Sequence, residues 1–137
     1  MIYKAYEIAS KAHAGQLDKA GEPYTFHIGA VAAQMKTEEE MAVAYLHDTL
    51  EDTDLTAEDL LNAGIPESVV EAVKVMTHDP AVPYMDYIAS IKKNELARKV
   101  KIADLMHNSC LIRLDSITQK DIERCRKYMD ALQVLIS

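Results

Sequence analysis

The chain has 137 residues, of which 49% are hydrophobic and 27% are charged, and its net charge is −7 at pH 7. This length and composition predict a single folded domain over residues 1–137 and exclude an intrinsically disordered chain. The acidic charge argues against a protein that binds duplex DNA or RNA, because such proteins usually carry a basic face. A small anionic ligand remains compatible, since a metal ion and a few local cations can reverse the field inside one pocket.

No apolar run approaches the length of about eighteen residues that a membrane helix needs, and the first residues lack the apolar core of a signal peptide. We therefore expect a cytoplasmic protein without a membrane partner. The two cysteines, Cys110 and Cys125, are too few for a disulfide framework and lack the spacing of a zinc ribbon, so both are expected to be reduced thiols. The sequence does not predict the oligomeric state.

Apolar residues recur at helical spacing along the chain, and no segment shows the convincing alternation of a strand. The sequence therefore predicts a compact all-α domain of about six to eight helices. The first helix is expected to end near Ala14, and the second to extend from Phe26 to Met35, after a loop that contains Gly and Pro. Thr37 and Glu40 form a capping-box pattern, which predicts the start of a third helix that includes Leu50.

The same kinds of signal continue through the rest of the chain. Thr56 to Asp59 indicates another helix start, and Asn62-Ala63-Gly64 is typical of a helix end. Pro66 suits the first turn of the next helix, which should end near Met76. We expect a loop from His78 to Pro83 and then three final helices, over Tyr84 to Ile91, Leu96 to Leu114 and Ile117 to Leu135, the last of them opened by Thr118 with Asp121.

The stretch AYLHDTLEDTD, residues 44–54, places one imidazole and four carboxylates within about two helical turns. His47 and Asp48 diverge by about 100° on a helix, yet both can bind one ion in the wedge between them. Their donor atoms suit Mn²⁺, Fe²⁺ or Zn²⁺ better than Ca²⁺. Glu51 and Asp52 each follow one of these residues by four positions, where a carboxylate can orient a water or transfer its proton. Solvation of a helix end is the alternative explanation for Asp52.

A complete metal site needs ligands from elsewhere in the fold. Asp104 lies in the otherwise apolar stretch VKIADLM, where a carboxylate is costly to bury without a partner. A metal ion would provide that partner. A buried ion pair with Lys101 or Arg98 is the alternative explanation, and the sequence does not separate the two.

Three further residues also have two explanations each. His27 fits a ligand, but it also fits a capping or core histidine near the start of its helix. His107 and Asn108 follow Asp104 by three and four residues and share its helical face. Asn108 could contact a ligand. His107 could equally be a packed residue that forms a hydrogen bond with the backbone. A second His-Asp pair, His78-Asp79, shows that an isolated dipeptide is weak evidence for a metal site.

Three segments occur together in one order: KAHAGQLDKAGEPYTFH, AYLHDTLEDT and ARKVKIADLMHN. As a set they resemble the HD-domain metal phosphohydrolases, and within these the Rel/Spo-type alarmone hydrolases, including the stand-alone small alarmone hydrolases. The resemblance extends from about Ile2 to Leu114. It implies a helical HD-domain fold and one Mn²⁺, or another divalent transition metal, with four protein ligands: His27, His47, Asp48 and Asp104.

The resemblance also implies an activity. In the manganese-dependent members, an acidic pair that matches Glu51 and Asp52 assists a metal-activated water, which attacks the phosphorus that joins a 3′-pyrophosphate to the ribose. The implied substrate is therefore a guanosine tetra- or pentaphosphate-type alarmone, and Lys19 and Asn108 are the implied substrate contacts. The alternatives are an HD-domain hydrolase of another nucleotide phosphoester and a non-catalytic nucleotide-binding module.

The sequence departs from the family pattern near the expected substrate. Asp18, Leu105 and Cys110 occupy positions that are usually cationic in the family. These departures bear on the choice of nucleotide, because the metal and acidic sets are intact. Two further residues match family positions. Tyr24 is a weaker candidate for substrate contact and fits a packed aromatic residue better, and we expect His13 to support its loop rather than bind the metal.

Overall fold

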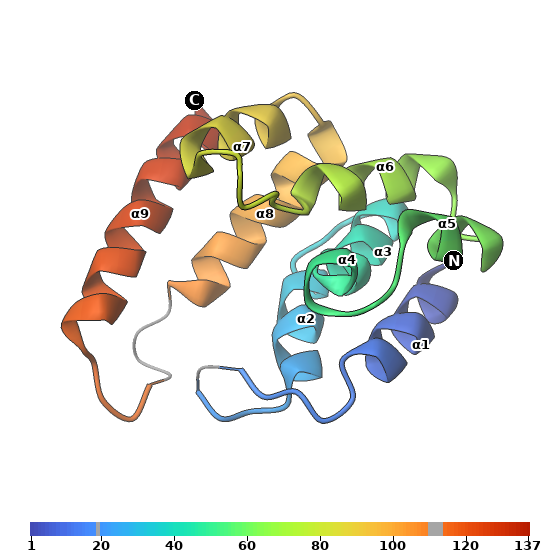
Figure 1. Ribbon diagram of the computed structural model, residues 1–137, viewed down its shortest axis with the longest axis horizontal. Helices are drawn as coiled ribbons and strands as arrows, with labels where there is room; N and C mark the ends of the chain where they lie inside the picture. The colour runs from blue at the N-terminus through green and yellow to red at the C-terminus, as the bar shows by residue number, and fades with distance from the viewer. Residues whose placement is uncertain (19, 110–113) are drawn as a thin grey trace.

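The computed structural model describes residues 1–18, 20–109 and 114–137, and within these ranges the chain forms helices and one isolated β-bridge, between Leu17 and Pro23 (Figure 1). The all-α prediction is confirmed. The helices over the described residues are α1 (Ile2–Ala12), α2 (Tyr24–Ala32), α3 (Glu38–Leu46), α4 (Thr49–Asp52), α5 (Ala57–Asn62), α6 (Glu67–Met76), α7 (Tyr84–Lys92), α8 (Glu95–Asn108) and α9 (Gln119–Ile136).

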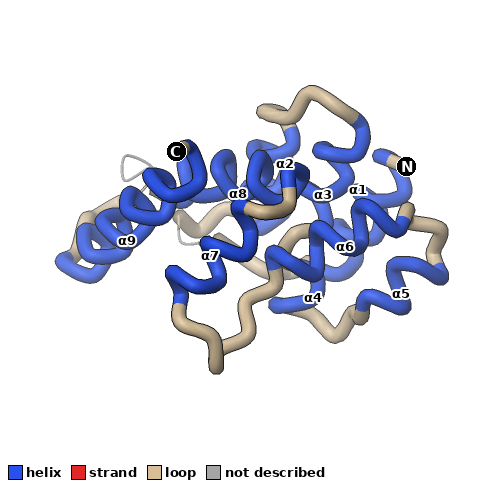
Figure 2. The backbone as a smooth tube through the Cα atoms, turned by 90° about the horizontal axis from the view of Figure 1, so that it is seen from above, coloured by secondary structure: helices blue, strands red, loops and turns tan. Residues whose placement is uncertain are grey.

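Helices α3 and α8 are the central elements of the fold. Helix α3 packs against α1, α2, α6 and α8, and α8 packs against α2, α3, α6, α7 and α9. Figures 1 and 2 show α1 and α9 toward opposite ends of the molecule, with α3 and α8 between them. The core is built from fully buried aliphatic side chains such as Leu46, Ile88 and Leu105. Because α8 contacts α2 and α3, it brings together the three segments that carry the family resemblance.

The helix predicted from Thr37 through Leu50 is interrupted at the His-Asp pair. Thr37 caps α3 as expected, because its hydroxyl oxygen accepts a hydrogen bond from the Glu40 backbone at 3.1 Å. Helix α3 then ends at Leu46, and Asp48, with φ −105° and ψ 2°, lies outside helical geometry. The Thr49 hydroxyl donates to the Leu46 carbonyl at 2.8 Å, a local bond that competes with the helical pattern. The prediction of one continuous helix was therefore wrong here.

Other boundaries follow the predicted signals more closely. Thr56 and Thr118 each form a capping box, with Asp59 and Asp121 respectively, and the chain leaves α5 through Gly64 at φ 92°. Helix α8 is shorter than predicted, because it ends at Asn108 rather than Leu114. Among the residues that the structure describes, no helix combines the length and apolar character that a membrane span requires.

Candidate metal centre and substrate cavity

The structure brings the four predicted metal ligands together. His27 lies on α2, His47 and Asp48 at the junction of α3 and α4, and Asp104 on α8, and one ligand atom from each lies within 4.8 Å of all the others. Asp104 Oδ1 is 2.9 Å from His27 Nε2 and 3.2 Å from His47 Nε2. His47 Nε2 is also 3.2 Å from Asp48 Oδ2. All of these residues are buried except Asp48, which is partly exposed.

The hydrogen bonds behind the histidines fit a metal ion at the centre of this cluster. His47 Nδ1 lies 2.6 Å from the Ala44 carbonyl, to which it can only donate, so the neutral ring presents an unprotonated Nε2 to Asp48 and Asp104. A lone pair and two carboxylates that face one another repel unless a cation lies among them. A divalent ion would provide it, and a backbone carbonyl behind a histidine is the usual arrangement around bound metals. The mixed nitrogen and oxygen donors fit Mn²⁺, Fe²⁺ or Zn²⁺.

Asp104 also has the buried ion pair that the sequence offered as the alternative to a metal. Lys101 Nζ is 3.0 Å from Asp104 Oδ2, while Asn108 Nδ2 donates to Oδ1 at 3.1 Å. Arg98, the other candidate partner, instead donates to the Leu135 carbonyl at 3.0 Å. The two explanations for Asp104 are therefore compatible, because one carboxylate oxygen faces the histidines and the other faces Lys101.

The electrostatics favour an ionised Asp104. Burial by itself raises the pKa of this carboxyl, but the charge of Lys101 beside it, followed by the effect of the neighbouring histidine rings, holds the pKa well below its usual range. The pKa of Asp48, in contrast, is raised well above the usual value, first by burial and then by the charge of Asp104. Two carboxylates this close can both ionise more readily when a cation lies between them.

Two residues outside the ligand set support it. The Tyr24 hydroxyl donates to Asp48 Oδ2, and His107 Nδ1 lies 2.6 Å from His27 Nδ1, on the side of the ring that faces away from Asp104. The sequence suggested packing roles for both. His13 supports its loop as expected, because its buried ring lies 3.0 Å from Gln16 Oε1, and it is not part of the four-residue cluster.

We predict that His107→Ala weakens Mn²⁺ binding about 10–100-fold, the usual cost of removing a residue that orients a metal ligand. The physical reason is that the His27 ring loses the partner that fixes its orientation and its protonated nitrogen. The measurement is a Mn²⁺ titration followed by electron paramagnetic resonance. Met106→Ala, at an exposed neighbour on α8, is the matched control. Unchanged affinity in His107→Ala would contradict this role.

The predicted acidic pair lies beside the cluster. Glu51 and Asp52 are exposed residues of α4, and their carboxylates form a second close group with that of Asp48. Glu51 Oε1 accepts a hydrogen bond from the backbone N–H of His78 at 2.7 Å. The pair therefore lies where it can reach a water near the cluster. Its catalytic role stays a prediction.

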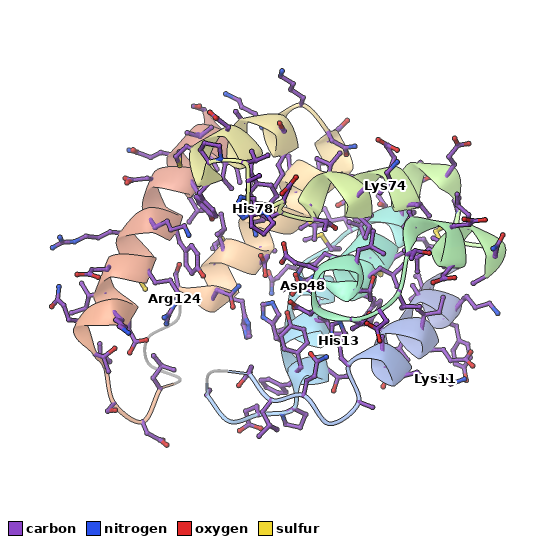
Figure 3. The ribbon with its side chains drawn as sticks, in the orientation of Figure 1. Lys11, His13, Asp48, Lys74, His78 and Arg124 are labelled. Atoms are coloured by element: carbon purple, nitrogen blue, oxygen red, sulfur yellow. The ribbon has the colours of Figure 1, made fainter. Side chains whose placement is uncertain are left out.

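Three members of the cluster, His27, Asp48 and Asp104, line one cavity of about 470 Å³ together with the acidic pair. Helix α9 contributes two residues to the lining of this cavity, Tyr128 and Arg124, the second of which is labelled in Figure 3. Arg124 Nη2 is 2.8 Å from Asp121 Oδ1, whereas its Nε is buried and has no hydrogen-bond partner among the described residues. Lys101 and Asn108 also line the cavity. A larger hollow of about 650 Å³ on another side of α8 lacks such a group of acids and histidines.

The sequence did not single out Arg124 or Tyr128. Both lie beyond Leu114, where the family resemblance ends, on an amphipathic helix rich in charged residues. Nothing in the sequence distinguishes Arg124 from exposed cations on the same helix, such as Arg126. Only the packing of α9 against α7 and α8 brings this face of α9 to the cavity.

The structure places the predicted substrate contacts, and the residues at positions that are usually cationic in the family, in different surroundings. Lys19 and Cys110 lie outside the described residues. Asn108 reaches the cavity but also orients Asp104. Asp18 lines the cavity too, and its Oδ1 accepts the backbone N–H groups of residues 20 and 22 at 2.9 and 3.0 Å, so its carboxylate holds the turn of the loop. Leu105 is fully buried in the core, which removes it from any contact with a ligand.

An all-α domain that groups a histidine, a His-Asp pair and a distant aspartate has the arrangement of an HD domain. No family model matches the sequence. Among curated proteins, it is similar to the guanosine-3′,5′-bis(diphosphate) 3′-pyrophosphohydrolase of Aquifex aeolicus, with 32% identity over 118 residues. It is also similar to the bifunctional (p)ppGpp synthase/hydrolase SpoT of Escherichia coli, with 34% identity over 121 residues. Each match covers 78% of this chain but only 17% of the relative.

The fold is also that of a solved protein. A structure described as a metazoan ortholog of SpoT that hydrolyses ppGpp superposes with a TM-score of 0.77, covering 98% of this chain and 84% of that one, at 22% sequence identity. The superposition shows the shared helical fold, and the two curated matches show that the chain is related in sequence to the Rel/Spo-type alarmone hydrolases over 78% of its length.

Proposed function

We propose that the chain removes the 3′-pyrophosphate from guanosine tetra- or pentaphosphate-type alarmones, with Mn²⁺ as its cofactor. One observation carries the proposal: the histidine and aspartate cluster opens, through His27, Asp48 and Asp104, onto a cavity that the acidic pair and two cations, Lys101 and Arg124, also line. The names of the curated relatives support this choice of substrate. Since the chain spans only 17% of these relatives, the proposal concerns the hydrolase reaction alone.

The cavity supplies what this hydrolysis requires. His27, His47, Asp48 and Asp104 would hold one divalent ion, which supplies Lewis-acid chemistry by lowering the pKa of water and offsetting charge on phosphoryl oxygens.

The acidic pair, Glu51 and Asp52, would carry out the proton transfer that the attack requires. Glu51 or Asp52 accepts a proton from the attacking water, whose oxygen forms a bond to the phosphorus attached to O3′. The P–O3′ bond breaks, O3′ takes up a proton, and pyrophosphate leaves with the oxygen of the water.

Arg124 would bind phosphate oxygens of the substrate. Arg124 lines the cavity, its Nη2 pairs with Asp121, and its buried Nε has no hydrogen-bond partner within the part of the chain that the structure describes. Planar guanidinium groups match phosphate geometry with two parallel hydrogen bonds. Arg124 therefore supplies a cation to a cavity in which Asp18 occupies a position that is usually cationic.

We predict that Arg124→Met lowers kcat/KM about 10–100-fold, mainly through KM, because a hydrogen bond to a charged group contributes about 1.5–3 kcal/mol. Stability should change little, since the ion pair with Asp121 is partly exposed. Initial rates over a range of alarmone concentrations give both kinetic constants. Arg126→Met, at an exposed position on the same helix, is the matched control. Equal effects of the two substitutions would remove Arg124 from the substrate site.

The proposal is tested by measuring phosphate and pyrophosphate release from a panel of nucleotides with Mn²⁺, for the wild type and for Asp48→Ala. The expected result is pyrophosphate release from the 3′-pyrophosphorylated guanosine nucleotides by the wild type and none by the variant. Turnover of a different phosphoester would favour the other hydrolase alternative. Absence of metal-dependent turnover on the whole panel would overturn the enzyme proposal.

A further inference from the structure

The second His-Asp pair of the sequence contacts the acidic pair of the cavity. His78 and Asp79 lie in the loop between α6 and α7. The backbone N–H of His78 donates to Glu51 Oε1 at 2.7 Å, and among the described residues this is the only hydrogen bond to the Glu51 carboxylate. Glu51 itself is exposed on a helix of only four residues. The loop therefore restricts a side chain that α4 alone leaves free to rotate.

The ring of His78 fixes the position of this backbone donor. Nε2 lies 2.7 Å from the Val82 carbonyl and donates to it, which closes the loop on itself. The ring also stacks on Tyr87 of α7, with centroids 4.5 Å apart and an angle of 27° between the planes. His78 is labelled in Figure 3, at the loop between α6 and α7. Removing the ring would release the loop both from its own carbonyl and from α7.

Tyr87 connects this loop to the metal cluster. Its buried ring is held by a hydrogen bond from its hydroxyl to the Met76 carbonyl, at the end of α6. Lys101 Nζ lies 5.5 Å from the centroid of the same ring and pairs with Asp104 at 3.0 Å. A continuous series of contacts thus extends from His78 to Asp104, behind the cavity.

Asp79 has no part in this series. It is exposed, and its Oδ1 accepts the backbone N–H of Ala81 at 2.9 Å, a bond that shapes the turn. No group of metal-ligating atoms within the described residues includes His78 or Asp79. Within the described residues, the second His-Asp pair is therefore not part of a second metal site, and His78 is the member that contacts Glu51 at the cavity.

We propose that His78 is a positioning residue for hydrolysis, which holds the Glu51 carboxylate at a fixed place relative to the metal cluster. The inference rests on the proposed function, since it requires Glu51 to act on the attacking water. A catalytic group that is displaced by about 1 Å can cost about 100-fold in rate, because the reacting atoms must be aligned. Substrate binding and metal binding do not require this alignment. Loss of the contact between His78 and Glu51 is therefore expected to lower kcat and to leave KM and Mn²⁺ affinity nearly unchanged.

The test compares His78→Ala with the wild type, using Mn²⁺-loaded protein and guanosine 3′,5′-bis(diphosphate). We expect kcat to fall about 10–100-fold, with KM and Mn²⁺ affinity within about twofold of the wild type. His78→Phe retains the stacking on Tyr87 and should lose less activity. Asp79→Asn, which retains the oxygen that binds Ala81, is the matched control and should keep the wild-type kcat.

A double-mutant comparison isolates the route through Glu51. In a Glu51→Gln background, His78→Ala should cause little further loss of kcat, because the group that it positions no longer accepts a proton. The amide proton of His78 should also exchange faster with solvent in Glu51→Ala than in the wild type. An undiminished kcat in His78→Ala, an equal loss in both backgrounds, or unchanged amide exchange overturns this inference while the wild type still turns over. No turnover by the wild type overturns the proposed function and this inference together.

Discussion

Replacing Asp104 by alanine will abolish Mn²⁺ binding and lower the stability of the metal-free protein by about 3 kcal/mol, near the lower end of the cost of breaking a buried ion pair. One oxygen of Asp104 faces His27 and His47, and the other pairs with Lys101, whose side chain is only 14% exposed. The substitution therefore removes a metal ligand and leaves a largely buried ammonium without its carboxylate. Urea unfolding with and without Mn²⁺ measures both effects.

The control for this experiment is Asp130→Ala, which removes an exposed carboxylate from α9. Wild type and control should gain about 2.7 kcal/mol in free energy of unfolding when free Mn²⁺ exceeds the dissociation constant 100-fold. Asp104→Ala should gain nothing under the same conditions. A Mn²⁺-dependent increase in its unfolding midpoint, equal to that of the wild type, would exclude Asp104 as a ligand.

The second large effect is expected at the acidic pair. Glu51→Gln and Asp52→Asn should each lower kcat, and the more important of the two by about 10²–10⁴-fold, the usual contribution of a general acid or base. Mn²⁺ affinity should stay near that of the wild type, because neither residue belongs to the buried ligand set. Steady-state kinetics and Mn²⁺ titration on the same preparations separate the two quantities.

Asp54→Asn serves as the control, since it removes an exposed carboxylate just beyond the pair. It should leave kcat unchanged. Loss of Mn²⁺ binding in Glu51→Gln or Asp52→Asn would show instead that the acidic pair coordinates the ion. Normal kcat in both variants would leave only helix-end solvation as their role.

Local signals predicted most of the fold because most of its helix boundaries are locally determined. The capping boxes at Thr56 and Thr118 are satisfied within four residues of sequence, and they are where the sequence placed them. The break between α3 and α4 was missed, since it depends on the conformation of Asp48 and on the bond from Thr49 to Leu46. Apolar periodicity continues across this break and gives no sign of it.

The grouping of the four proposed ligands was predictable because these residues stand in recognisable sequence contexts. Asp104 is a carboxylate in an apolar stretch, and His47 and Asp48 belong to the resemblance. The contacts behind them depend on tertiary structure. The spacing of His107 from Asp104 suggested that the two residues share one face of a helix. It did not indicate that His107 of α8 would contact His27 of α2.

The sequence did not predict which cationic side chains line the cavity. Asp18 and Leu105 suggested that cations near the substrate were few, because these positions are usually cationic in the family. In the structure Leu105 belongs to the core, and Arg124 enters the cavity from α9. The packing of a helix outside the resemblance therefore changes the electrostatic account of the site.

Hydrolysis of guanosine 3′,5′-bis(diphosphate) in ¹⁸O-labelled water tests the central claim most directly. Attack at the phosphorus attached to O3′ predicts Mn²⁺-dependent formation of equal amounts of GDP and pyrophosphate, with the label in pyrophosphate alone. Release of inorganic phosphate, label in the nucleotide, or no turnover by protein that binds Mn²⁺ would contradict the account.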